Sequence, residues 1–308
     1  MNRKLFKLSI LTLFGLLLAA CAPVAPAAST ADVPQAYAQA DALVDTEWVL
    51  AHLDDPTVHF LDIGGDPEVF AQGHIPGALF VNLGSDLTNP NDSTRGQILE
   101  QDALSALFSQ LGINNGDTVV VYDANRNLLS TRAFWAIKYY QHPDVRLYNG
   151  GLTKWQADGQ ELSTEAVEPT PTEYVAAEAD PAIRTTSEYL LAHLDDPSVV
   201  TCDTRGAEEY AGTDVRAARG GHIPGALNLE WSNAVNDDGT FKDAPALGKL
   251  YLAAGFPPDK EIITYCQTGV RGAHTWFVLK ELLGYPNVRN YDGSWEEWGN
   301  REDTPVEQ

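Results

Sequence analysis

The chain has 308 residues, of which 44% are hydrophobic, and a formal net charge of −23 at pH 7. This length and apolar content suffice for two ordinary domains. Because the chain is so acidic, it has no surplus of Lys and Arg to displace the counterions of nucleic-acid phosphates. Nucleic acid is therefore excluded as an expected partner. With only three cysteines, a disulfide-rich scaffold is excluded too.

Residues 1–20 have the pattern of a secretion signal. A basic segment, MNRKLFK, precedes the apolar LSILTLFGLLLAA, and Cys21 follows directly. The segment resembles a bacterial lipoprotein signal, and it is shorter than the ~20 apolar residues that a membrane-spanning helix needs. We therefore expect cleavage before Cys21 and lipidation of Cys21. The mature protein is then extracytoplasmic, lipid-anchored in the bacterial cell envelope, and touches the membrane only through that lipid because its negative charge repels anionic lipids.

Residues 21–41 are rich in Ala and Pro and have no apolar period, which predicts a tether. The chain then repeats itself. Tyr122 precedes Tyr148 by as many residues as Tyr265 precedes Tyr291. Two segments recur unchanged, AHLDDP at 51–56 and 192–197, and GHIPGAL at 73–79 and 221–227. The shared register indicates an internal duplication.

Strand and helix signals alternate within each copy. In the second copy, the helical spacing of TSEYLLAHL (186–194) precedes the β-branched run SVVTCD (198–203), and the apolar run KEIITY (260–265) precedes the helical AHTWFVLKELLGY (273–285). Such alternation predicts an α/β fold with a parallel sheet covered by helices on both faces. We expect two tandem domains, 42–160 and 181–308, joined by the polar linker 161–180.

The loop CQTGVR, residues 266–271, follows the buried run 260–265 at the carboxyl end of a predicted strand, where ligands bind in such sheets. A tight loop that enters a helix turns its N–H groups inward and forms an anion-binding nest, for which Gly269 supplies the turn. A Cys266 thiolate would be stabilised there as a nucleophile, and Arg271 would add positive charge for an anionic substrate.

On spacing alone, a buried apolar cysteine at a strand end explains Cys266 equally well. The duplication favours function, because the register places Asp123 opposite Cys266 and Leu128 opposite Arg271. One copy therefore lacks both the thiol and the guanidinium.

Four segments, DTRGAEEYAG, GGHIPGALNLEW, YCQTGVRG and YDGSWEEWGN, together resemble the rhodanese family, and the duplicated layout resembles two-domain thiosulfate sulfurtransferases. The resemblance covers roughly 45–305. It implies two tandem rhodanese-like domains, of which 42–160 is catalytically silent and 181–308 is catalytic. It also implies that the nucleophile Cys266 is carried on a six-residue substrate-binding loop completed by Gln267, Thr268, Gly269, Val270 and Arg271.

By the same resemblance, Cys266 takes the outer sulfur of thiosulfate as a persulfide, sulfite leaves, and cyanide or a thiol accepts the sulfur. The expected partners are a small anionic sulfur donor and a nucleophilic acceptor. No metal and no organic cofactor is expected.

Asp203 and Arg205 follow the run 198–203 and should emerge beside the loop. They could steer the anion or brace the loop, but a structural ion pair or helix cap is the favoured interpretation. His222 has a counterpart, His74, in the silent copy, which favours a role in the fold over general-base catalysis.

The remaining residues near the site have plainer interpretations. His274 is expected to be a solvated helix residue, and Trp295 and Trp298 are expected in the core. Cys202 is expected to be a buried core thiol, with a regulatory disulfide to Cys266 as the alternative.

The sequence also bears on three other functions. Phosphatase loops of related folds resemble C-x5-R, one residue longer than the spacing from Cys266 to Arg271. Mercaptopyruvate sulfurtransferases resemble the chain overall, but an arginine holds their substrate carboxylate where Glu209 stands here, and a carboxylate should repel that substrate. A persulfide-carrying sulfur-binding protein without high turnover stays open, as do the physiological acceptor and the oligomeric state.

Overall fold

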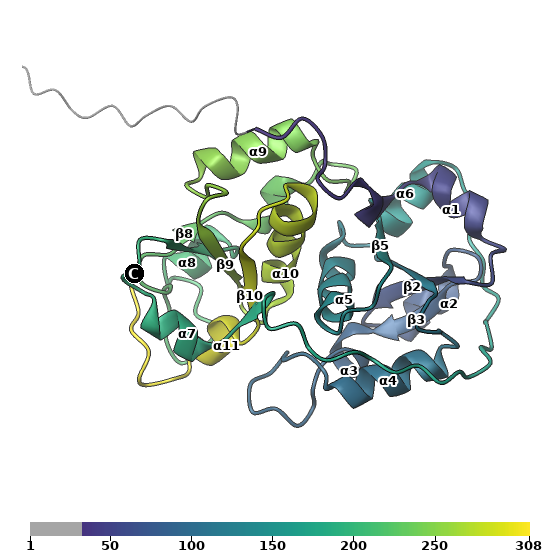
Figure 1. Ribbon diagram of the computed structural model, residues 1–308, viewed down its shortest axis with the longest axis horizontal. Helices are drawn as coiled ribbons and strands as arrows, with labels where there is room; N and C mark the ends of the chain where they lie inside the picture. Colours follow the sequence, from purple (N-terminus) through teal and green to yellow (C-terminus); the bar gives the residue numbers. More distant parts are fainter. Residues whose placement is uncertain (1–32) are drawn as a thin grey trace, which may run out of the picture.

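The computed structural model of the protein describes residues 33–308, which form two five-stranded sheets, one in each half of the chain (Figure 1). The N-terminal sheet has the strand order β1-β5-β4-β2-β3, and the C-terminal sheet has the order β6-β10-β9-β7-β8. Within these described residues, every pairing between named strands is parallel. The two orders match strand for strand, so the duplication extends to the topology. This confirms the expected α/β fold of two tandem domains.

The N-terminal domain is built from the following elements. Its strands are β1 (Leu43–Val44), β2 (Val58–Gly64), β3 (Leu79–Asn82), β4 (Thr118–Tyr122) and β5 (Val145–Tyr148). Its helices are η2 (Ala40–Ala42), α1 (Thr46–His52), α2 (Pro67–Gln72), α3 (Leu83–Asp86), α4 (Gln101–Gln110), α5 (Leu128–Tyr139) and α6 (Gly151–Ala157).

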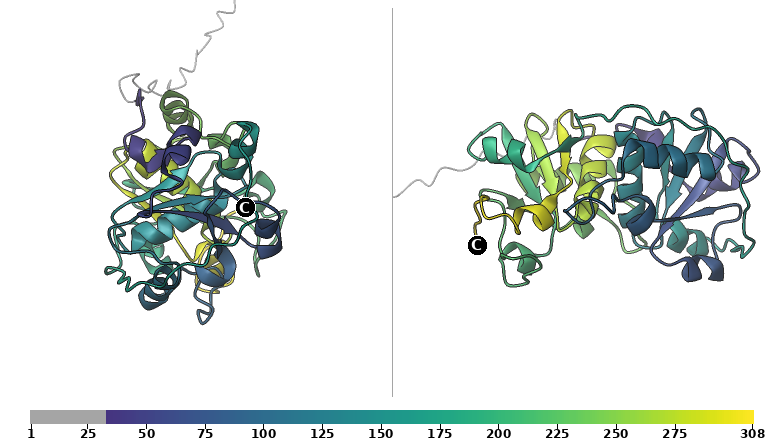
Figure 2. Two further views of the ribbon diagram at one scale, coloured as in Figure 1. Left: turned by 90° about the vertical axis from the view of Figure 1, so that its right-hand side faces the viewer. Right: turned by 90° about the horizontal axis from the view of Figure 1, so that it is seen from below.

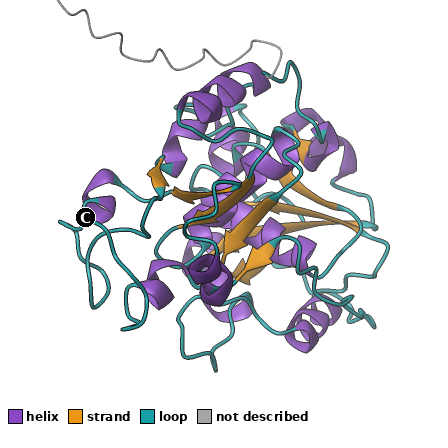
Figure 3. Ribbon diagram, turned by 60° about the vertical axis from the view of Figure 1, so that its left-hand side comes forward, coloured by secondary structure: helices purple, strands orange, loops and turns teal. Residues whose placement is uncertain are grey.

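The C-terminal domain follows the same plan. Its strands are β6 (Arg184–Thr185), β7 (Val199–Asp203), β8 (Leu227–Asn228), β9 (Glu261–Tyr265) and β10 (Val288–Tyr291). Its helices are α7 (Ser187–Ala192), α8 (Ala207–Tyr210), η3 (Trp231–Ala234), α9 (Ala244–Ala253), α10 (Val270–Phe277), η4 (Val278–Leu282) and α11 (Ser294–Trp298). Colouring by secondary structure shows the strands enclosed by helices (Figure 3).

Local sequence explains several of these boundaries. Asp45, Asp66 and Asp243 cap α1, α2 and α9 by accepting a backbone N–H of the first turn, and Pro67 occupies the first position of α2. The central strands β4 and β9 consist almost wholly of buried residues because helices cover both faces of each sheet.

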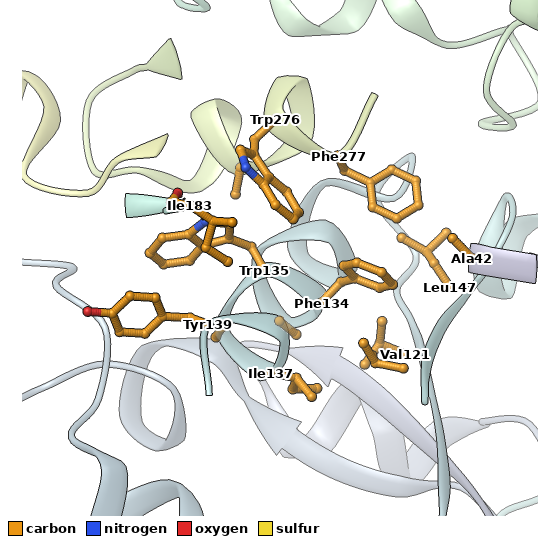
Figure 4. Close-up of a cluster of buried hydrophobic side chains, with 14 of the residues drawn as sticks. Ala42, Val121, Phe134, Trp135, Ile137, Tyr139, Leu147, Ile183, Trp276 and Phe277 are labelled. Carbon is orange, nitrogen blue, oxygen red and sulfur yellow. Dashed lines mark hydrogen bonds between the residues drawn. The ribbon is translucent and has the colours of Figure 1, made fainter. Parts of the chain in front are cut away.

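The two domains share one hydrophobic core. Helix α5 of the first domain and α10 of the second lie side by side between the sheets, as Figure 2 shows from below. The rings of Phe134 and Phe277 meet edge to face with centroids 4.8 Å apart, and Trp135 and Trp276 flank them (Figure 4). Because both helices contribute large buried side chains, the domains are packed together rather than merely joined by a linker.

The segments outside the two sheets also pack on them. In the linker 161–180, which contains no helix or strand, the buried Tyr174 lies against the first domain, and Thr172 donates its N–H to Ser109. At the described start of the chain, Tyr37 donates its hydroxyl to the Lys242 carbonyl, at 2.8 Å. The expected tether is therefore not free over residues 33–41, because Tyr37 packs against the second domain.

Cys21 and the predicted signal lie outside the described residues. Among residues 33–308, no helix combines the length and the apolarity that crossing a membrane requires.

Candidate active site

Cys266 is the first residue after β9, and it is 1% exposed. Two contacts from the turn into α11 fix its backbone. Its N–H donates to Ser294 Oγ at 3.1 Å, and its carbonyl accepts the Trp295 N–H at 2.9 Å. Ser294 has a left-handed backbone with φ of 51°, and its Oγ also donates to the Tyr291 carbonyl. The end of β9 and the start of α11 thus hold the sulfur-bearing residue in one place.

The loop after Cys266 is shorter than expected because α10 begins at Val270, not Ala273. Val270 and Arg271 form the first helical turn. Gly269 precedes them with φ of 76°, and its carbonyl accepts a hydrogen bond from Asn290 Nδ2 at 3.1 Å. The first N–H groups of a helix have no intrahelical acceptor, so this end carries positive potential. The cysteine therefore lies at a helix start suited to an anion.

Arg271 connects Cys266 to Glu209. Its guanidinium makes a two-point hydrogen bond with the Glu209 carboxylate, at 2.5 and 2.9 Å. The same guanidinium lies close enough to the Cys266 side chain to interact with it. Burial alone would lower the pKa of Arg271, but the interactions with Glu209 and Cys266 outweigh burial and raise the pKa above its ordinary value. Arg271 therefore stays charged between the thiol and a carboxylate.

Glu209 is the residue whose role sequence reasoning understated. Burial alone would raise its pKa, but the hydrogen bonds and charge of Arg271 lower it, so Glu209 is ionised at neutral pH. Arg216, which is half exposed, lies 3.6 Å from the same carboxylate. The negative charge of Glu209 thus offsets part of the positive charge that Arg271 brings to the site.

Asp203 and Arg205 form a fully buried ion pair, with Nη2 and Oδ2 2.6 Å apart. Tyr265 donates its hydroxyl to Asp203, also at 2.6 Å, and the Arg205 guanidinium lies 4.6 Å from the ring centroid of Trp295. Tyr265 and Trp295 both adjoin the Cys266 backbone. The ion pair therefore supports the structure beneath the loop. The Arg205 guanidinium binds Asp203 and does not face the Cys266 loop.

The other loop residues contact both domains. Gln267 donates its amide to the Arg216 carbonyl and to Glu296, at 3.1 Å each. Thr268 lies against Gly96 of the first domain, where an added Cβ would come within 3.0 Å of it. Arg95, from the same segment of the first domain, pairs with Glu296 at 3.1 Å. The first domain therefore forms one wall of the site.

An interdomain ion pair sits behind this wall. Arg132 of α5 and Asp292, both about 1% exposed, approach to 2.6 Å. Arg132 also donates to the Gly96 carbonyl, and Asp292 accepts the Ile98 N–H. A cavity of about 170 Å³ lies beside it, between Arg95, Arg132 and the loop residues Thr268 and Val270. Sequence patterns gave no signal for this wall because its residues come from the other domain.

The expectation that His274 is solvated is wrong. The residue is fully buried between Trp231 and Phe241, and burial lowers its pKa to about 3, so it is neutral. The reason is that α10 lies between its own sheet and α5 of the first domain, so that every residue from Gly272 to Phe277 is buried.

His222 is also buried and stacks on Tyr210, with ring centroids 3.7 Å apart, and its backbone pairs with that of Glu307. Trp295 and Trp298 are buried in the core.

Cys202 and Cys266 are both free thiols, and burial raises the pKa of Cys202 well above its ordinary value. Within residues 33–308, no group of three or more His, Cys, Asp or Glu side chains is arranged to hold a metal ion.

In the first domain, Asp123 occupies the position of Cys266 after β4. Its carboxylate is buried and accepts the N–H groups of Asn125, Asn127 and Ser130, at 2.5 to 3.2 Å, as well as the Ser130 hydroxyl. The loop that could bind an external anion is thus filled by its own side chain. Counted from the helix start at Leu128, the residue opposite Arg271 is Leu129 rather than Leu128, and neither carries a charge.

The chain resembles known proteins over almost its whole length. The model of the rhodanese-like domain matches residues 45–158 and again residues 186–301. The "Putative thiosulfate sulfurtransferase" of Mycolicibacterium smegmatis is 41% identical over 278 residues, covering 88% of this chain and 99% of that protein. The "Sulfur carrier protein TtuD" of Thermus thermophilus is 41% identical over 281 residues, covering 88% of this chain and 98% of that protein.

Two solved structures also resemble this chain in fold over most of its length. The anaerobic ergothioneine biosynthesis enzyme from Chlorobium limicola, in complex with trimethyl histidine, matches with a TM-score of 0.81 and 25% identity, covering 88% of this chain and 71% of that chain. Wild-type EanB matches with a TM-score of 0.79 and 26% identity, covering 88% of this chain and 70% of that one.

Proposed function

Because this chain belongs to the rhodanese family and is a sulfurtransferase of two rhodanese-like domains, we propose that it takes its sulfur from thiosulfate and transfers it through a persulfide on Cys266. One observation carries the proposal. Cys266 directly follows β9 and opens the short loop that leads into α10, and the Arg271 guanidinium in the first turn of that helix interacts with its side chain. A nucleophilic thiol beside helix N–H groups and a cation suits an anionic sulfur donor.

The reaction proceeds in two balanced steps. The Cys266 thiolate attacks the outer sulfur of thiosulfate, the S–S bond of the donor breaks, and its electron pair leaves with sulfite. The new persulfide is then attacked at its terminal sulfur by cyanide or a thiolate, and Cys266 recovers its thiolate. In both steps, the N–H groups of the helix start and Arg271 stabilise the negative charge on the reacting sulfur and the bound anion. Because the two half-reactions share one covalent intermediate, the enzyme should show ping-pong kinetics.

In this proposal the first domain is catalytically silent. Asp123 replaces the thiol, and its carboxylate satisfies the N–H groups of its own loop. A carrier role without high turnover is the second candidate, supported by the similarity to the protein named sulfur carrier TtuD.

Thiosulfate is favoured over 3-mercaptopyruvate because of Glu209. Its carboxylate occupies the guanidinium of Arg271 in a two-point contact and repels a second carboxylate. Glu209 weakens the attraction for either anion, but 3-mercaptopyruvate also needs a cation for its carboxylate, whereas the N–H groups of the loop and helix start can hold the sulfonate oxygens of thiosulfate.

The test is thiocyanate formation from thiosulfate and cyanide by the purified protein, beside Cys266→Ala and with 3-mercaptopyruvate as a parallel donor. Turnover with thiosulfate that disappears in Cys266→Ala supports both the reaction and the nucleophile. If neither donor is turned over but a persulfide accumulates, the carrier role replaces the enzyme. Inactivity without persulfide would contradict both.

We also propose that the protein is held outside the cytoplasm by a lipid on Cys21, as its N-terminal sequence suggests. Cys21→Ala should move the protein from the membrane fraction to the soluble fraction of the cells that produce it. An unchanged distribution would contradict the anchor.

A further inference from the structure

The first domain contains a cavity of about 200 Å³ at the carboxyl ends of β2 and β4. None of the six residues of the Cys266 loop lines it. Its walls are largely apolar, with Phe70, Phe80 and Leu129 among them. Among residues 33–308, its only charged lining residues are Asp62 and Asp66, and no Lys or Arg of this part of the chain lines it. An anionic sulfur donor would therefore find no partner here.

The second domain fills the corresponding place with its own cation. Arg205 covers the Asp203 carboxylate through Nε, at 2.9 Å, and through Nη2, at 2.6 Å. Nη2 also donates to the Gly221 carbonyl at 2.7 Å, and the guanidinium lies over the ring of Trp295. A carboxylate, a carbonyl and an aromatic wall thus surround one buried guanidinium.

The register of the duplication places Asp62 opposite Asp203, Gly64 opposite Arg205 and Gly73 opposite Gly221. Leu152 stands opposite Trp295. All four of these first-domain residues line the cavity. The first domain therefore has the same carboxylate and glycine, but Gly64 supplies no cation between them and Leu152 supplies no aromatic ring.

The missing side chain would point at the carboxylate. A Cβ built on Gly64 would lie 3.9 Å from Asp62 Oδ1, with the Phe80 ring edge 2.9 Å away. Phe80 stands where the second domain has Asn228. An arginine at position 64 would therefore need Phe80 to move, and the space beside Asp62 that Arg205 covers in the other domain belongs to the cavity here.

We propose that this cavity binds a small alkylguanidinium, with the planar cation on the Asp62 carboxylate and the alkyl group against the aromatic wall. A guanidinium pairs with a carboxylate through two parallel hydrogen bonds, which an ammonium cannot do. A volume of about 200 Å³ is room for such a molecule rather than for a single water. The site is separate from Cys266 and makes the first domain a ligand-binding module.

The surroundings of Asp62 make binding dependent on pH. Burial and, to a smaller extent, the nearby Asp123 raise the pKa of Asp62 to about 6, although the interactions with Tyr122 and His74 oppose this rise. Asp66, at the start of α2, is the other charged residue of the wall. Because only the ionised form of Asp62 attracts a cation, binding should be full above pH 7 and be lost as the pH falls through 6.

Calorimetric titration of the full chain with n-propylguanidinium tests the proposal, with n-propylurea as an uncharged ligand of the same shape. At pH 7.5 the guanidinium should bind and the urea should bind at least about tenfold more weakly. Asp62→Asn should weaken guanidinium binding by about tenfold or more and leave thiosulfate turnover within about twofold. Lowering the pH to 5.0 should weaken binding about tenfold in the unaltered chain and hardly at all in Asp62→Asn.

A second variant fills the cavity with the sister domain's own residues, Gly64→Arg together with Phe80→Asn. This variant should not bind the guanidinium. A midpoint of thermal unfolding at or above that of the unaltered chain would show that the new arginine pairs with Asp62. If this variant does not fold, Asp62→Asn still decides the outcome. Equal binding of guanidinium and urea, undiminished binding in Asp62→Asn, or no saturable binding by the unaltered chain would each overturn the proposal.

Discussion

Arg271 interacts with both Glu209 and Cys266, and the balance between these interactions sets how much positive charge a substrate meets. Glu209 accepts N–H groups from both terminal nitrogens of the guanidinium, at 2.5 and 2.9 Å, while the Cys266 side chain lies close enough to interact with the same group. The pairing is buried enough that solvent screens it only weakly, since the side chains are 17% and 5% exposed. Glu209 therefore limits the attraction of the site for any anion.

Glu209→Gln should lower the KM for thiosulfate about fivefold, equivalent to about 1 kcal/mol, because Arg271 keeps its charge and loses its competitor. Turnover of 3-mercaptopyruvate should rise relative to that of thiosulfate. Steady-state kinetics with both donors measures this.

Glu208→Gln is the matched control, since it removes the same charge from the neighbouring, exposed position of α8. It should leave both donors unchanged. A KM for thiosulfate that stays constant or rises in Glu209→Gln would contradict the role assigned to Glu209.

At this scale, part of the site could be predicted and part could not. Cys266 and Arg271 follow a strand directly, so local spacing was enough to place them together. Glu209 lies 62 positions from Arg271 in the chain. Residue spacing in the sequence does not predict a contact between residues so far apart in the chain. His274 was expected in solvent because its polarity was visible in the sequence, whereas the aromatic rings that enclose it come from η3 and the segment before α9.

The loop and α10 act as one element. Gly269 makes the left-handed turn that starts the helix, and an added Cβ would lie 3.0 Å from the Asp292 carbonyl and 3.1 Å from Arg132. Apolar spacing predicted the helix only from Ala273, because Val270 and Arg271 look like loop residues until that turn is known. A helix start is set by such turns as much as by periodicity.

Gly269→Ala should lower kcat/KM for thiosulfate by about tenfold or more, because the loop must shift to relieve both close contacts and the left-handed strain, together worth about 1–3 kcal/mol. Kinetic measurements and thermal unfolding check this together. Gly116→Ala is the control, since no atom lies within 4 Å of the added Cβ there. Activity retained in Gly269→Ala would mean that the loop needs no glycine.

Across the whole molecule, the duplication could be predicted from sequence in full, because repeated motifs in one register imply repeated topology. The packing between the two copies could not. Arg132 and Asp292 are 160 positions apart and meet only because α5 and α10 pack face to face. Patterns within one domain do not report such contacts, which depend on how two complete domains dock.

Arg132→Met should destabilise the protein by about 3–5 kcal/mol, since it removes the buried cation on Asp292 Oδ1 and leaves the partly exposed Arg184, 3.2 Å from Oδ2, as the remaining cationic partner. Thiosulfate turnover should fall as well, because Asp292 also holds the segment that borders the loop. Urea unfolding and kinetics measure the two effects.

Arg146→Met provides the comparison, because its pair with Asp144 is partly exposed, at 25% and 37%, and should contribute at most about 1 kcal/mol. If the two variants lose equal stability, the interdomain pair does not hold the site together.

The most direct test of the central claim is the mass of the protein after incubation with thiosulfate alone, with no acceptor present. The account predicts that each chain gains one sulfur atom on the peptide that contains Cys266, and that an equal amount of sulfite is released. Cys202→Ser should behave in the same way, while Cys266→Ser should gain nothing. Sulfur found on Cys202 instead, or no gain in the unaltered protein, would contradict the assignment of Cys266 as the residue that carries the sulfur.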